Sequence, residues 1–154
     1  MKKEAWATDR GFRTGIYLGA TLVAALVLMP GNSALGIIGM IVGPLIAVLI
    51  ASRMAEYKVN FSRGADLGFR STFYGLLGAC AIYDIIWHVF GYQLWKVENL
   101  DRVISWAVET MHDWTNPRAW IVITVQMITI AICAGIIGAP AGLLGAKLFS
   151  RATC

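Results

Sequence analysis

The chain has 154 residues, of which 58% are hydrophobic and 14% are charged, and its net charge at pH 7 is +4. This apolar fraction exceeds the roughly 45–50% that is usual in soluble domains, which argues against a soluble globular protein. The length leaves room for one domain. The basic excess does not indicate a nucleic-acid partner, because it follows the position of the predicted membrane segments.

Two long stretches contain no Lys, Arg, Asp or Glu, namely residues 15–52 and 119–146. Uncharged apolar runs of this length are typical of membrane-spanning helices, since a helix rises about 1.5 Å per residue and the hydrocarbon core is about 30 Å thick. Pro30-Gly31-Asn32-Ser33 divides the first stretch with a turn sequence. The first stretch therefore predicts two spans, at about residues 14–29 and 34–51.

The second half of the chain predicts two further spans, at about residues 67–95 and 119–146. Between them, residues 97–114 carry apolar side chains at helical spacing and charges elsewhere, which predicts an amphipathic helix. We interpret this helix as lying in the outer interface or capping the bundle, with a lid or docking surface as the alternative. The predicted fold is an all-α integral membrane protein: one domain, residues 1–154, with a four-transmembrane-helix bundle of two hairpins plus the amphipathic helix.

The distribution of Lys and Arg predicts the orientation. With the N-terminus inside, the inner segments hold ten of the 13 basic residues, and the outer segments hold Lys96, Arg102 and Arg118. Basic residues accumulate on the cytoplasmic side of membrane proteins. We also expect the first span to be retained rather than cleaved, because a second span follows within four residues. The expected location is the bacterial inner membrane, with both termini cytoplasmic.

Glycines recur four residues apart along the predicted spans. Small residues at this spacing let helix backbones approach closely in lipid, where no hydrophobic effect drives helix association. The sequence therefore predicts packing inside the bundle, with homodimerisation through one of these faces as the alternative. The same spacing occurs at Gly64 and Gly68. The predicted helix-packing positions are Gly15, Gly19, Gly39, Gly43, Gly138 and Gly142.

A short motif occurs twice, as Gly36-Ile37-Ile38-Gly39 and as Gly135-Ile136-Ile137-Gly138. In both places a proline follows, and the span ends in Ser-Arg. If the motif marks a repeat, the two hairpins are related in parallel rather than in the inverted topology of many transporters. The alternative is coincidence between two glycine-rich segments.

One polar constellation lies within the predicted spans. Asp84 and His88 are four residues apart and share a helix face, and Gln126 is expected at similar depth in the fourth span. One interpretation is that these side chains form a proton relay or a small polar pocket. The alternative is that Asp84 and His88 lie near the membrane surface and are hydrated there. Zinc takes three or four protein ligands, so we expect no metal, and no cofactor or nucleophile motif is recognisable.

Residues Val59 to Phe69, with sequence VNFSRGADLGF, follow a basic inner loop and lead into the third predicted span. With Asn116-Pro117 before the last span, this layout resembles a bacterial family of small four-span membrane proteins, known only as a domain of unknown function. The resemblance implies a fold and a location but no activity or site residues. The chain departs from the family in its shorter outer loop and its glycine density.

The sequence as a whole predicts a non-enzymatic membrane scaffold or accessory subunit. Its expected partners are the lipid bilayer and either a second copy of the chain or another membrane protein. The alternative is a small oligomeric transporter or channel that uses Asp84 and His88.

Overall fold

The computed structural model describes residues 2–29, 33–55, 59–90 and 117–149 of the chain. These residues form four helices and no strands: α1 (Lys2–Val27), α2 (Ser33–Ala55), α3 (Phe61–Phe90) and α5 (Pro117–Phe149). The all-helical prediction is therefore confirmed for the described residues. The amphipathic helix predicted at residues 97–114 lies outside them.

The helix ends follow from local chemistry. Helix α1 ends at Val27, just before the predicted Pro-Gly turn. The carbonyl of Asn60 accepts a 2.8 Å hydrogen bond from the amide of Gly64, which places Asn60 at the N-cap of α3. Helix α5 begins at Pro117, where the missing amide proton of proline removes no helical hydrogen bond. The helices are longer than the predicted spans: α1 starts twelve residues before the expected Thr14.

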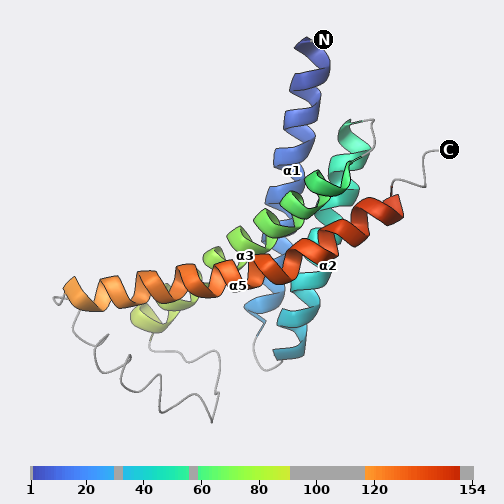
Figure 1. The fold of residues 1–154 in the computed structure, drawn as a ribbon. Coiled ribbons are helices and arrows are strands. Elements are labelled where there is room, and N and C mark those ends of the chain that lie inside the picture. The colour runs from blue at the N-terminus through green and yellow to red at the C-terminus, as the bar shows by residue number, and fades with distance from the viewer. Residues whose placement is uncertain (1, 30–32, 56–58, 91–116, 150–154) are drawn as a thin grey trace.

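The four helices form two antiparallel hairpins, α1 with α2 and α3 with α5 (Figure 1). The closest packing is within each hairpin, and contacts of α3 with α1 and α2, and of α5 with α2, join the two. Within the described residues, the backbones of α1 and α5 do not approach each other closely. Each hairpin thus pairs helices that follow each other in the described chain.

Two described helices are long and apolar enough to cross a membrane, over Ala34–Met54 in α2 and Trp120–Phe149 in α5. Helices α1 and α3 do not meet this measure over their described residues. Charged residues lie near the starts of both helices: α1 carries Asp9, Arg10 and Arg13 in its first half, and α3 carries Arg63, Asp66 and Arg70. The structure therefore supports two candidate spans, and the predicted four-span bundle is not confirmed.

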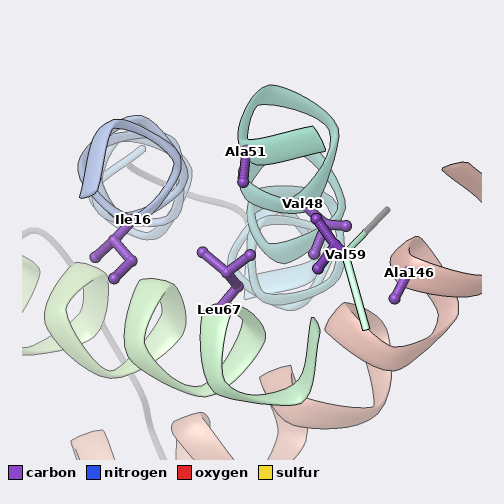
Figure 2. Packing of buried hydrophobic residues seen from close by; sticks show 6 residues of the cluster. All are labelled: Ile16, Val48, Ala51, Val59, Leu67 and Ala146. Atoms are coloured by element: carbon purple, nitrogen blue, oxygen red, sulfur yellow. The ribbon is translucent and has the colours of Figure 1, made fainter. Parts of the chain in front are cut away.

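A cluster of buried apolar side chains joins all four helices at one end of the molecule. Leu67 of α3 is fully buried and points into the space beneath α1 and α2 (Figure 2). Its neighbours in the cluster are Ile16, Val48, Ala51, Val59 and Ala146. The cluster brings the start of α3 beside the ends of α2 and α5. A second cluster, around Val23 of α1, includes Leu76 and Ala79 of α3 and Ala134 of α5.

Small residues fill the interior of the structure, and large apolar residues lie at its surface. Most of the buried apolar side chains are Ala or Val, and many of the glycines are buried as well. Large apolar side chains lie outside: in α5 alone, Ile121, Val125, Ile136 and Leu148 are more than half exposed. A protein in water buries its large apolar residues first. Here the helices approach through small residues and present the large ones outward.

Candidate functional site

The α1–α2 contact is formed by glycines that face the opposite backbone; we call it the first glycine seam (Gly15, Gly19, Gly39 and Gly43). A β-carbon added at Gly19 would lie 2.8 Å from the carbonyl oxygen of Gly43, and one added at Gly43 would lie 2.9 Å from that of Gly19. Real β-carbons essentially never approach other atoms so closely. The two helices are therefore in contact only because neither position carries a side chain.

The other two members of the first seam meet different neighbours. At Gly15 the added β-carbon would lie 2.5 Å from the carbonyl oxygen of Ala47. At Gly39 it would lie 3.0 Å from the β-carbon of Leu26. The nearest atom at Gly39 is thus a β-carbon that needs to shift by a few tenths of an ångström, whereas at Gly15 it is a backbone oxygen at a shorter distance.

The α3–α5 contact repeats this arrangement; we call it the second glycine seam (Gly64, Gly68, Gly138 and Gly142). A β-carbon at Gly142 would collide with the carbonyl oxygen of Gly64 and lie 2.8 Å from the α-carbon of Gly68. At Gly138 it would collide with the hydroxyl of Thr72. At each of these eight glycines, four in each seam, an added β-carbon would lie within 3.0 Å of an atom of a neighbouring helix.

The two seams have the same register. Gly19 faces Gly43 and Ala47 in the first seam, and Gly64 faces Gly142 and Ala146 in the second. The duplicated Gly-Ile-Ile-Gly motif supplies Gly39 to one seam and Gly138 to the other. The short repeat in the sequence thus corresponds to a repeated contact between helices.

Among the residues that the structure describes, two hydroxyl side chains are fully buried, Ser71 and Thr72 of α3. Both donate to the carbonyl oxygen of Gly68, over 3.2 Å from Ser71 and 2.9 Å from Thr72. Ser71 faces α1, where a β-carbon at Gly19 would lie 3.0 Å from its own, and Thr72 faces α5 at Gly138. These hydroxyls satisfy their own helix and fill the space between the hairpins. Sequence reasoning missed them, because Ser and Thr in a span give no signal of burial.

The predicted polar constellation is only partly visible. Helix α3 continues through positions 84 and 88, which are therefore one helical turn apart. The side chains of Asp84 and His88 lie outside the described part of the structure. The side chain of Gln126 is exposed on α5. The predicted meeting of these three residues stays a prediction.

Basic side chains gather at the end of the molecule where α3 begins and α2 and α5 end. Arg53 lies in the last turn of α2, and Lys147 lies in the last turn of α5. Arg70 forms a 2.7 Å ion pair with Asp66 and lies over the ring of Phe12, 5.9 Å from its centre. Both partners of that ion pair are more than a third exposed, so it contributes at most about 1 kcal/mol. The ion pair therefore adds little to stability, and its two charged side chains lie at the surface.

Among the residues that the structure describes, no three His, Cys, Asp or Glu side chains are grouped as a metal site would require. No protein-family model matches the chain, and searches of curated proteins and of solved structures found no match. The geometry described above is therefore the basis for a functional proposal.

Proposed function

We propose that the chain is a non-enzymatic scaffold or accessory subunit of the bacterial inner membrane, with all four helices crossing the bilayer and both termini in the cytoplasm. The observation that carries the proposal is the distribution of residue size. Small residues make the helix contacts, and large apolar side chains such as Ile121, Ile136 and Ile37 are exposed. Lipid tails cover such side chains at no cost, whereas in water a continuous apolar surface of this kind promotes aggregation.

Charge supports the orientation. The starts of α1 and α3 and the ends of α2 and α5 lie toward one end of the molecule (Figure 1). That end carries Arg13, Arg53, Arg63 and Lys147, whereas Arg118 lies at the opposite end of α5. A cytoplasmic location for the basic end agrees with the usual bias of Lys and Arg.

The interior supports a scaffold rather than a conduit. Where α3 meets α5, the backbones themselves are in contact, and the neighbouring hydroxyls of Ser71 and Thr72 are already bonded to Gly68. This part of the bundle is filled by protein atoms, so the surfaces available for a partner are on the outside.

Cysteine labelling of intact cells tests the topology. In a background with Cys80, Cys133 and Cys154 replaced by Ala, a single cysteine is placed at Ser62 or at Ser105. Four spans put these positions on opposite sides, so an impermeant maleimide should label position 105 and spare position 62. If α2 and α5 alone cross the membrane, both positions lie on one side and react alike, which would refute the four-span proposal.

A flux measurement tests the scaffold against a transporter. The purified chain is reconstituted into liposomes that contain a pH-sensitive dye, and a proton gradient is applied. We expect the gradient to decay as slowly as in empty liposomes, and Asp84→Asn to change nothing. A proton flux that disappears in Asp84→Asn would contradict the scaffold and favour a transporter.

A further inference from the structure

Helix α5 has two lengthwise faces of different character. One face carries the second glycine seam and is buried against α3. The other lies on the outside and is mostly apolar, with Ile130, Ile137 and Leu144 all at least 42% exposed. Because the packing glycines are already used inside the bundle, association with another helix requires a face of this second kind.

One side chain on the outer face does not suit lipid. Gln126 is exposed, lies within the uncharged stretch 119–146, and has no hydrogen-bond partner among the described side chains. The neighbouring hydroxyls behave differently: Thr124 bonds to the carbonyl of Trp120 over 2.7 Å, and Thr129 bonds to that of Val125 over 2.8 Å. An amide without a partner in hydrocarbon is costly, because lipid tails neither donate nor accept hydrogen bonds.

The position of Gln126 is set by the length of the helix. It lies seven residues after Ala119, which corresponds to about 10 Å along the axis from the start of the uncharged stretch. The residues around it are Val125, Met127 and Ile128. Gln126 is therefore inside the apolar part of α5, near the end opposite the basic end.

The outer face continues from Gln126 with the spacing of a helix–helix seam. The exposed residues Gln126, Ile130, Cys133, Ile137 and Leu144 follow the alternating three- and four-residue steps of a left-handed helix pair, with Pro140 between the last two. Helices in membranes commonly cross with this geometry. The face thus offers an apolar stripe with a single hydrogen-bonding group near one end.

We propose that two copies of the chain associate through this face of α5, with the Gln126 amides hydrogen-bonded to each other. The proposal rests on the membrane location proposed above. A primary amide both donates and accepts, so it is its own complement. A two-fold axis along the membrane normal brings identical positions of the two copies together. A second copy therefore supplies the missing partner at the same depth, which lipid tails do not.

Cross-linking of Cys133 tests the geometry. With Cys80 and Cys154 replaced by Ala, Cys133 is the only thiol, and a membrane-permeant oxidant should convert the chain to a disulfide-linked dimer in native membranes. The control moves the thiol to Ile128, which is also exposed but lies about 140° around the helix from Cys133. We expect no dimer from that variant. Absence of a Cys133 dimer, or equal dimer from both variants, would overturn the proposal.

Dilution of the chain in liposomes tests whether the Gln126 amide stabilises the dimer. The purified chain is labelled with donor and acceptor dyes, and energy transfer is followed as the lipid-to-protein ratio rises. Gln126→Leu should raise the dimer dissociation constant roughly three- to eight-fold, the range expected for one or two interhelical hydrogen bonds in lipid. Thr124→Val is the matched control and should leave it unchanged. An unchanged constant in Gln126→Leu, or a monomer throughout, would overturn the proposal.

Carbonate extraction separates this failure from failure of the membrane proposal. A chain that stays in the carbonate-washed membrane and labels at position 105 alone, but gives no dimer, overturns only the association through α5. A chain that is washed out of the membrane overturns both proposals.

Discussion

The two hairpins use the same register but differ in what stands opposite each glycine. In the α1–α2 hairpin, Gly43 faces the side chain of Val23 as well as the backbone of Gly19. In the α3–α5 hairpin, the equivalent Gly142 faces only backbone atoms, which belong to Gly64 and Gly68. At this matched position, therefore, a glycine lies partly against a side chain in the first hairpin and against two other glycines in the second.

Glycine spacing alone therefore does not determine how closely two helices pack. A side chain opposite a glycine has rotamers and can be shortened by mutation, whereas backbone opposite a glycine can do neither. We therefore expect the second seam to be the less tolerant of added atoms. Substitutions at matched positions of the two hairpins test this expectation.

The largest loss is expected for Gly142→Ala. The added methyl group would meet the backbone of α3 at Gly64 and Gly68, so α3 and α5 must separate. Overpacking of this kind costs about 1–3 kcal/mol, and we expect the upper part of that range. Unfolding of the purified chain in detergent, by heat or by added denaturing detergent, measures it. Gly78→Ala is the control: nothing lies within 4 Å of an added β-carbon there, so no loss is expected.

Gly43→Ala should cost less, about 1–2 kcal/mol, because part of the obstruction is the γ-methyl of Val23. The same unfolding measurement applies. The difference between the hairpins then appears in a double-mutant cycle. Val23→Ala should recover part of the loss in Gly43→Ala, since it removes the obstructing methyl. Strictly additive losses would show that the Gly19 backbone is the whole obstruction and that the hairpins do not differ as described.

Thr72→Val should cost about 1 kcal/mol. The change removes the buried hydrogen bond to Gly68 and puts a methyl group against Gly138, where the hydroxyl now lies. By the register of the two seams, Val27 of α1 is the counterpart of Thr72, so the variant makes the second hairpin resemble the first. Thr72→Ser keeps the hydroxyl and should retain most of the stability. If Thr72→Ser unfolds as far below the wild type as Thr72→Val, the hydrogen bond to Gly68 is not what this side chain contributes.

The smallest effect is expected for Gly39→Ala, at about 0.5 kcal/mol or less. The added methyl would lie 3.0 Å from the β-carbon of Leu26, which needs to shift by only a few tenths of an ångström. The higher helix propensity of Ala offsets part of this cost. A melting temperature lowered as far as in Gly142→Ala would show that the contact at Gly39 is as restrictive as the closer contacts at Gly142.

The packing glycines could be predicted from sequence because their spacing of four is a local property of one helix. Their partners could not, since nothing in the spacing of Gly39 and Gly43 says whether Val23 or a glycine lies opposite. Gly78 shows the converse: it is a glycine in a helix with open space beside it. The four-span interpretation depends on uncharged runs, and of the described helices only α2 and α5 are long and apolar enough to span a membrane.

The polar positions show a second limit of sequence reasoning. The sequence places Gln126 at a depth similar to that of Asp84, but depth says nothing about which face of a helix a residue occupies. In the structure Gln126 is exposed on α5. The glycine seam determines this orientation, since burying Gly138 and Gly142 against α3 turns the opposite side of the helix outward.

The pairing of α1 with α2 also bears on how the chain is made. Both helices of the first seam emerge from the ribosome before α3 begins at Phe61, and only three residues separate Val59 from the last residue of α2. Contacts between segments close in sequence form quickly, and synthesis adds residues slowly by comparison. The first hairpin can thus be complete when α3 arrives, and Val23 then offers Gly75 of α3 a surface that is already assembled.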